Sequence, residues 1–213
     1  MDLNEAYSSE IESSPRIMFI VDEPIVAHFF LLLQQGVTIR SRIGCNISAF
    51  LREEIGADDA TIEKIQSVIL DGKPVDDLES AVIKDGSVLA LSAAMPGLVG
   101  ATLRRGGAYS SFRSAITYHE TGYECAHGEG FVQIRIFNLL MAELGPGLLQ
   151  KGVIIRPEEL IRFAAEQPQD FWQGCRRITL DGAPLDASEL RDSAWFSGKG
   201  KVILSVSSDQ ARA

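Results

Sequence analysis

Short stretches of the chain alternate apolar and polar residues, and this pattern predicts β-strands. In VQIRIF, residues 132–137, the valine and isoleucines fall on one face and the glutamine and arginine on the other. A two-residue period of this kind is typical of a strand with one buried face. Strands are predicted in this way at residues 16–21, 36–43, 67–72, 87–93, 152–156, 177–182 and 201–207.

Apolar residues at helical spacing predict two main helices. Asn46 suits an N-cap, because its side chain can accept a hydrogen bond from a free backbone N–H, and Gly56 suits the C-terminal end. Pro157 suits the first position of the second helix, which Pro168 would end. A helical turn or two is also predicted in the apolar segments that follow the first strand of each half, residues 25–33 and 139–149.

Three blocks of sequence recur in the same order, which indicates an internal duplication. The matching stretches are LLQQGVTIR (32–40) with LLQKGVIIR (148–156), VILDGKPVDD (68–77) with ITLDGAPLDA (178–187), and GSVLALS (86–92) with GKVILSV (200–206). Two copies favour two related domains over a solenoid, which needs several stacked repeats. Each copy has the order strand, strand, helix, strand, strand, so its helix can cover one face of a mixed sheet.

This order resembles the β-grasp fold of ubiquitin and, more closely, the small sulfur-carrier subunit of molybdopterin synthase. The closer likeness lies in the apolar segment after the first strand and in the ending LDGKPVDD…KDGSVLAL. The resemblance covers residues 16–107 and 131–208, and it implies an α+β chain of two ubiquitin-like β-grasp domains, each with a mixed sheet and one main helix. The predicted organisation is a disordered tail (1–15), a first domain (16–94), a Gly-rich connecting segment (95–130), a second domain (131–208) and a short tail (209–213).

In the carrier family the functional residue is a C-terminal glycine whose carboxylate is activated. The second copy departs from that pattern, because it ends at Ala213 without a glycine pair. The first copy runs on through Gly106 and Gly107, which would match the family only after proteolysis. We interpret this stretch as a tail that became a linker, since glycine pairs are common in loops. The alternative is a sulfur-carrier or ubiquitin-like modifier precursor that is processed after Gly107.

The connecting segment also contains a group of possible metal ligands, His119, Cys125 and His127. Imidazole and thiolate suit Zn²⁺ or another transition metal. Their spacing matches no standard zinc finger, and the alternative is a polar loop with ordinary surface side chains. The Cys-x-His pair also permits a thiol nucleophile, although the spacing alone does not fix its geometry.

A small basic cluster, Arg104, Arg105 and Arg113, stands out against an acidic background. It could contact a phosphate, a carboxylate or a protein partner, or it could simply solvate a loop. Other residues are predicted to be structural: His28 as a packed or interface histidine, Asp71 and Asp181 in tight Asp-Gly turns, and Cys45 and Cys175 as small, partly buried groups.

Composition narrows the class of protein. With 46% hydrophobic and 23% charged residues, the chain has the usual mix of a globular protein. A net charge of -9 disfavours binding to nucleic acid or to an anionic membrane. Three widely spaced cysteines argue against a disulfide framework, and the polar N-terminus lacks the pattern of a signal peptide. These features predict a cytoplasmic protein.

No phosphate-binding loop, dinucleotide fingerprint, CxxC pair or nucleophile elbow is present in the sequence. We therefore predict a non-enzymatic binding or scaffold protein that needs no cofactor and contacts a protein partner or another copy of itself. The contact would use the sheets, the connecting segment or the apolar stretch FFLLL at residues 29–33. The alternatives are the carrier precursor and a metal- or anion-binding protein that uses the connecting segment.

Overall fold

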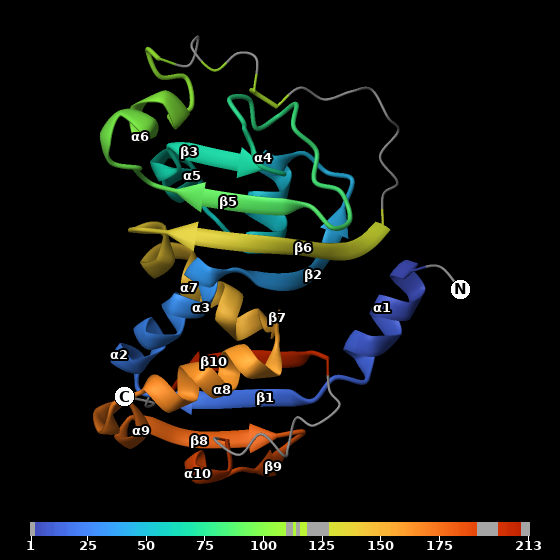
Figure 1. Ribbon diagram of the computed structural model, residues 1–213, viewed down its shortest axis with the longest axis vertical. Helices are drawn as coiled ribbons and strands as arrows, with labels where there is room; N and C mark the ends of the chain where they lie inside the picture. The colour runs from blue at the N-terminus through green and yellow to red at the C-terminus, as the bar shows by residue number, and fades with distance from the viewer. Residues whose placement is uncertain (1–2, 110–112, 114–115, 119–127, 191–199, 210–213) are drawn as a thin grey trace. The chain divides into compact units, whose positions relative to one another are not determined.

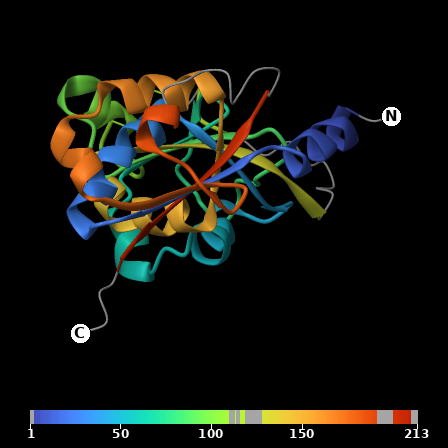
Figure 2. The same cartoon turned by 90° about the horizontal axis from the view of Figure 1, so that it is seen from below.

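The computed structural model describes residues 3–109, 113, 116–118, 128–190 and 200–209 (Figures 1 and 2). Over these residues the chain is an α+β protein, in which ten strands pair in both parallel and antiparallel directions and helices connect them. The chain forms two compact units. Unit 1 contains Met1–Leu32 and Leu148–Ala213, and unit 2 contains Leu33–Gly147.

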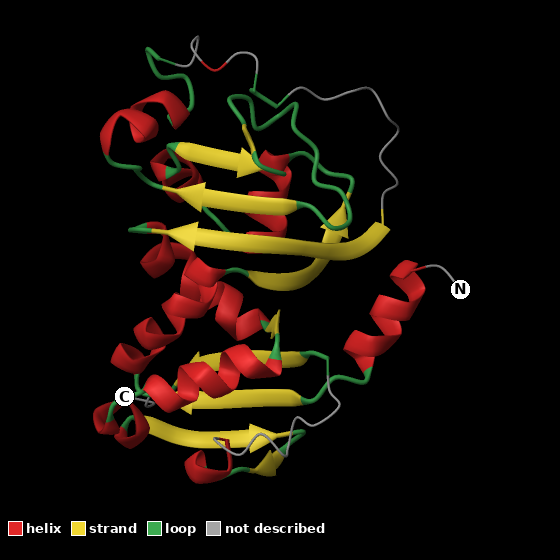
Figure 3. Ribbon diagram, in the orientation of Figure 1, coloured by secondary structure: helices red, strands yellow, loops and turns green. Residues whose placement is uncertain are grey.

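Unit 2 has the strand order β4-β3-β5-β6-β2 (Figure 3). Its strands are β2 (Val37–Ile43), β3 (Ser67–Leu70), β4 (Lys73–Pro74), β5 (Val88–Ser92) and β6 (Gly128–Phe137). The central strands β5 and β6 are parallel, and their outer neighbours β3 and β2 are antiparallel to them. The connection from β2 to β3 contains the helices α4 (Ile47–Phe50), η2 (Leu51–Ile55) and α5 (Asp59–Lys64).

The predicted ends of the helix in unit 2 are confirmed. The side chain of Asn46 accepts a hydrogen bond from the Ala49 N–H at 2.8 Å, as an N-cap should. Gly56 ends the helix with a left-handed φ of 83°. Between these ends the helix changes from α to π form at Leu51. Phe50 and Leu51 are fully buried, so this helix contributes directly to the core of unit 2.

Unit 1 has the strand order β7-β10-β1-β8-β9. Its strands are β1 (Arg16–Val21), β7 (Val153–Ile155), β8 (Cys175–Leu180), β9 (Ala183–Pro184) and β10 (Val202–Ser208). The parallel pair in the centre is β10 with β1, and the outer strands β7 and β8 are antiparallel to them. The connections contain α8 (Pro157–Glu166), α9 (Gln169–Gln173) and α10 (Ala187–Leu190), and α8 begins at the predicted proline.

The compact units do not follow the boundaries of the sequence repeat. Strand β1, from the first repeat, pairs with β10 and β8 of the second, and β6, from the second repeat, pairs with β2 and β5 of the first. Each unit therefore includes a first strand that belongs to the other repeat. That residues 16–94 and 131–208 form separate domains stays a prediction, whereas the strand pairing mixes the two repeats within each unit.

Two equivalent turns show how β1 fits into unit 1. In unit 2 the Asp71 carboxylate accepts from the Val88 N–H at 2.7 Å, and the Asp71 N–H donates to the Val88 carbonyl at 2.9 Å. In unit 1 Asp181 makes the same two bonds with Arg16, each at 2.8 Å. The φ angles of Asp71 and Asp181 are 50° and 49°, which confirms the predicted turns. The start of β1 therefore lies beside the Asp181 turn in unit 1, just as the start of β5 lies beside the Asp71 turn in unit 2.

The helical segments that follow the first strands are longer than predicted. After β1 come α2 (Glu23–Val26), η1 (Ala27–Phe29) and α3 (Phe30–Gln35), and after β6 comes α7 (Leu140–Lys151). Each of these segments begins in one unit and leads to a strand of the other, β2 or β7. Both segments are therefore chain connections from one unit to the other.

The N-terminal residues differ from the predicted disordered tail over 1–15, because Leu3–Glu12 form helix α1, which leads into β1 (Figure 2). Tyr7 and Ile11 are four residues apart, and Ile11 is only 5% exposed, so the helix has an apolar side to bury. Part of the predicted connecting segment is also regular, because Gly97–Leu103 form helix α6.

Strand β6 begins at Gly128, four residues before the start that the alternation predicted. Its glycine-rich beginning extends the pairing with β2 as far as Ile43. A Cβ on Gly130 would lie 2.7 Å from an oxygen of Asp85 and 3.0 Å from Ile43, so this close approach requires a glycine. The alternation missed this part of the strand because glycines carry no apolar signal.

Candidate functional site

Arg113 of the predicted basic cluster is a buried structural residue. Its side chain is 4% exposed, and its guanidinium donates to both carboxylate oxygens of Asp76, at 2.6 and 3.1 Å. It also donates to the carbonyl oxygens of Thr102 and Arg104 and to the hydroxyl of Thr117. These bonds attach the connecting segment to unit 2, so the charge of Arg113 is used inside the protein rather than on a surface.

The Arg-Arg-Gly-Gly stretch forms an ordered turn beside the same carboxylate. The Gly106 N–H donates to Asp76 Oδ1 at 3.1 Å, and the Gly107 N–H donates to the Arg104 carbonyl at 3.1 Å. Gly106 has a φ of 61°, in the left-handed region that favours glycine. In the intact chain the two glycines therefore belong to a fixed turn rather than to a free chain end, and processing after Gly107 stays a prediction.

The other predicted site residues form no assembled centre. Arg104 is exposed, and Arg105 is half-buried with its N–H bonded to the Gln66 carbonyl at 2.7 Å. The predicted metal ligands His119, Cys125 and His127 lie outside the described residues. Within the part of the chain that the structure describes, no three His, Cys, Asp or Glu side chains are placed to hold a metal ion together.

Removal of the Asp76 carboxylate tests the attachment of the connecting segment. We expect Asp76→Ala to lower the free energy of unfolding by about 3 kcal/mol, because the buried guanidinium of Arg113 would lose its counter-charge. Urea denaturation measures the change. Asp186→Ala is the matched control, since Asp186 has the corresponding place in the second repeat and is exposed. Equal losses for the two variants would contradict a structural role for the Asp76–Arg113 pair.

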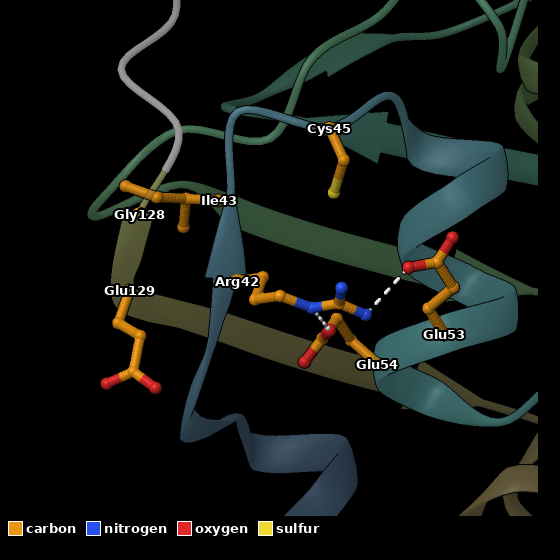
Figure 4. Close-up of a pocket in the computed structure, with 7 residues that line it drawn as sticks. All are labelled: Arg42, Ile43, Cys45, Glu53, Glu54, Gly128 and Glu129. Atoms are coloured by element: carbon orange, nitrogen blue, oxygen red, sulfur yellow. Dashed lines mark hydrogen bonds and ion pairs between the residues drawn. The ribbon is translucent and has the colours of Figure 1, made fainter.

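A pocket of about 540 Å³ opens in unit 2 beside the end of β2 and the start of β6 (Figure 4). The residues that line it are Arg42, Ile43, Cys45, Glu53, Glu54, Gly128 and Glu129. Figure 4 shows the Arg42 side chain reaching from β2 toward the two glutamates of η2. Four of the seven lining residues carry a charged side chain, and Ile43 and Cys45 are the less polar part of the lining.

The charges of this pocket are paired. Arg42 donates to Glu54 at 2.7 Å and to Glu53 at 2.6 Å, and these carboxylates raise the pKa of its guanidinium. Glu129 pairs with Arg40 of β2 at 2.5 Å. Arg42 and Glu53 are 63% and 57% exposed, so water screens their attraction and the pair contributes little to stability.

The thiol of Cys45 is not activated in this pocket. Partial burial, together with the negative charges of Glu54 and Glu53, raises its pKa above the ordinary value of a cysteine. A nucleophilic cysteine needs the opposite, a pKa lowered by a neighbouring cation or a helix N-terminus. Cys45 is half-buried, as predicted, and its surroundings favour the neutral thiol.

Cys175 and His28 also have structural surroundings. Burial, together with the nearby charge of Asp22, raises the pKa of Cys175 to about 11. The Nδ1 atom of His28 is 3.0 Å from Oε1 of Gln167, and its ring centroid is 5.3 Å from that of Phe171. The interpretation of His28 as a packed histidine is confirmed.

Sequence reasoning missed the pocket around Arg42. The adjacent glutamates Glu53 and Glu54 lie in a predicted helix, and Arg42 lies on the polar side of a predicted strand. Both features are ordinary for solvated faces, and their pairing depends on how the helix crosses the strand. The acidic pair just before the helix-ending glycine was the one available signal.

Exposed apolar side chains occur along the connecting segment. Leu98 and Val99 of α6 are 74% and 68% exposed, and Tyr109 and Ile116 are 47% and 57% exposed. Large apolar groups that remain in water are typical of contact surfaces when they occur together. Arg113 donates hydrogen bonds to the carbonyl oxygens of Thr102 and Arg104 and to the Thr117 hydroxyl, which are near Leu98, Val99 and Ile116 in the sequence.

A scan against protein-family models, a search of curated proteins and a search of solved structures each found no match to this chain. Among the described residues, none of the helices combines the length and the apolar character needed to cross a bilayer. Any function must therefore be inferred from the residues themselves.

Proposed function

We propose that the chain is a non-enzymatic binding protein built from two β-grasp units. In support, each unit has a parallel central pair of strands with antiparallel neighbours, and helices connect the second and third strands of each repeat. This arrangement is compatible with the resemblance to the ubiquitin-like fold that the sequence suggested. Because each unit uses strands of both repeats, the two units would act as one binding protein rather than as independent modules.

The exposed apolar side chains of the connecting segment are the observation that carries this proposal. The side chains of Leu98, Val99 and Ile116 are more than half exposed, and the buried Arg113–Asp76 pair joins this segment to unit 2. A surface that is already ordered loses little conformational entropy when it binds, so its apolar area contributes directly to affinity. We infer that the partner is a protein that buries these side chains.

The chemistry of the described residues favours binding over catalysis. The thiols of Cys45 and Cys175 have raised pKa values, and the charged groups of the pocket form ion pairs with each other. A catalytic site needs a group whose pKa suits its reaction or a charge that can stabilise a transition state. The carrier precursor and the metal-binding protein remain alternatives, which rest on Gly107 and on the ligand group of the connecting segment.

Site-specific cross-linking tests the contact. A photo-crosslinking amino acid at position 98 should trap discrete protein adducts in the cells that make this protein. The same group at position 139 is the control, because Leu139 is 76% exposed but lies outside the connecting segment. We expect Val99→Asp to reduce the adducts at position 98 at least about ten-fold, since a buried, unpaired charge opposes binding.

Sedimentation equilibrium of the same variants separates the two kinds of partner. A second copy of the chain predicts a dimer that Val99→Asp converts to a monomer, whereas another protein predicts a monomer throughout. Equal adducts at positions 98 and 139, or adducts that Val99→Asp leaves unchanged, would contradict binding through this segment. An unchanged unfolding temperature of the variant shows that the loss comes from the surface.

A further inference from the structure

We infer that the two halves of this chain, residues 1–107 and 108–213, stay bound to each other after the peptide bond between them is cut. The unit that the first half mainly forms takes its β6 from the second half, and the unit that the second half mainly forms takes its β1 from the first. The halves are complementary fragments. The binding partner of each half is the other half.

In unit 2 the second half supplies β6 to a place between two strands of the first half. Seven residue pairs join β6 to β2 and five join it to β5. The side chains of Val132, Ile134 and Ile136 are fully buried. Without β6, strands β2 and β5 would each expose a row of unpaired backbone groups beside an apolar face.

Polar contacts add to this attachment. The Phe131 N–H donates to Asp85 at 2.8 Å, and the Phe131 carbonyl accepts from the Gly86 N–H at 2.8 Å. Further along the second half, Glu143 of α7 pairs with Lys64 of α5 at 2.6 Å. The contact between the halves therefore continues past the end of β6 into α7.

In unit 1 the first half supplies β1 in the same way. Six residue pairs join β1 to β10 and five join it to β8, and Ile17, Phe19 and Val21 are fully buried. At the end of the strand, the Asp22 carboxylate accepts two hydrogen bonds from Arg176, at 2.7 and 2.8 Å. Each half thus inserts a central strand into the other, and separation would have to disrupt both units together.

The proposed cut lies in a turn that contributes to neither strand exchange. Gly106, Ala108 and Tyr109 are exposed, so a protease can reach the bond after Gly107. The Gly106 N–H and the Arg113 guanidinium would still be held by Asp76, one from each side of the cut. Cleavage there would create a Gly107 carboxylate without releasing residues 1–107 as a separate modifier.

The test inserts a recognition site for a sequence-specific protease between Gly107 and Ala108 of the full chain. After complete cleavage at micromolar concentration, we expect native mass spectrometry to find one species that contains both fragments. We also expect the unfolding temperature of the cut protein to rise with protein concentration, because unfolding now separates two molecules. Two separate fragments under native conditions would overturn the inference.

Co-expression of residues 1–107 and 108–213 as two chains provides a second measurement without an inserted site. We expect the two chains to co-purify at a ratio of one to one. Ile134→Asp in the second chain combined with Phe19→Asp in the first should abolish this, because the two charges lie in the cores of both units. Arg135→Asp is the matched control for position 134, since Arg135 is the exposed neighbour on the same strand. Chains that fail to co-purify, or that co-purify equally well when both Ile134→Asp and Phe19→Asp are present, would also overturn the inference.

Discussion

Phe19→Asp is expected to unfold unit 1, although Phe19 belongs to the first repeat of the sequence. Phe19 is fully buried in the middle of β1, where it is paired with Ile178 of β8 and Val206 of β10. An unpaired carboxylate in such a place costs several kcal/mol, which is comparable to the whole stability of a small protein unit. The damage should therefore appear in residues 153–208, which are distant in sequence from the substitution.

The mirror variant, Ile134→Asp, is expected to unfold unit 2. Ile134 lies in β6 of the second repeat, but it is paired with Val37 of β2 and Leu89 of β5. Hydrogen exchange of the backbone amides, read out by mass spectrometry, measures both variants in the same way. Each variant should cause its largest loss of protection in the strands contributed by the opposite repeat.

This pair of variants distinguishes strand pairing within each repeat from strand pairing between the two repeats. If each repeat folded with its own first strand, Phe19→Asp would expose residues 37–92 and Ile134→Asp would expose residues 153–208. The strand exchange predicts the reverse for both. Loss of protection within the repeat that carries the substitution would contradict the pairing of β1 with β8 and of β6 with β5.

Local patterns in the sequence were sufficient to predict the elements but not their partners. The alternation in VQIRIF and the cap at Asn46 depend on neighbouring residues, and the structure confirms both as strand and helix signals. Alternation describes a strand that is buried on one face without specifying which strands lie beside it. Because the two repeats are similar, β1 and β6 fit either unit by pattern alone, and long-range bonds such as Arg16 to Asp181 decide between them.

The candidate sites were predictable only in part, for a similar reason. The sequence identified the connecting segment, and within it Arg113, as unusual. It could not show that Asp76, 37 residues earlier, neutralises Arg113 inside the protein. Likewise, Glu53 and Glu54 pair with Arg42 only because η2 packs beside β2 in the folded protein. A sequence shows which residues are charged, whereas the residue that each one pairs with depends on the tertiary structure.

The aromatic cluster of unit 1 leads to the second large effect, a loss of about 4 kcal/mol of unfolding free energy in Phe29→Ala. Phe29 is fully buried, and its ring centroid is 5.1 Å from that of Phe19, 4.9 Å from Phe163 and 5.5 Å from Phe171. Removal of the ring deletes three aromatic contacts and leaves a cavity that the neighbouring rings can fill only in part.

Phe30→Ala is the control for this substitution, because Phe30 is the next residue but is only half-buried. We expect it to cost less than half as much, measured as the change in urea midpoint at constant slope. Phe163 and Phe171 come from the second repeat, so a large effect at Phe29 also reports contact between the repeats inside unit 1. Equal, small losses at Phe29 and Phe30 would mean that the first repeat does not pack into this core. The residues that follow β1 would then not pack against Phe163 and Phe171 of the second repeat, and the exchange of β1 would lose its strongest apolar support.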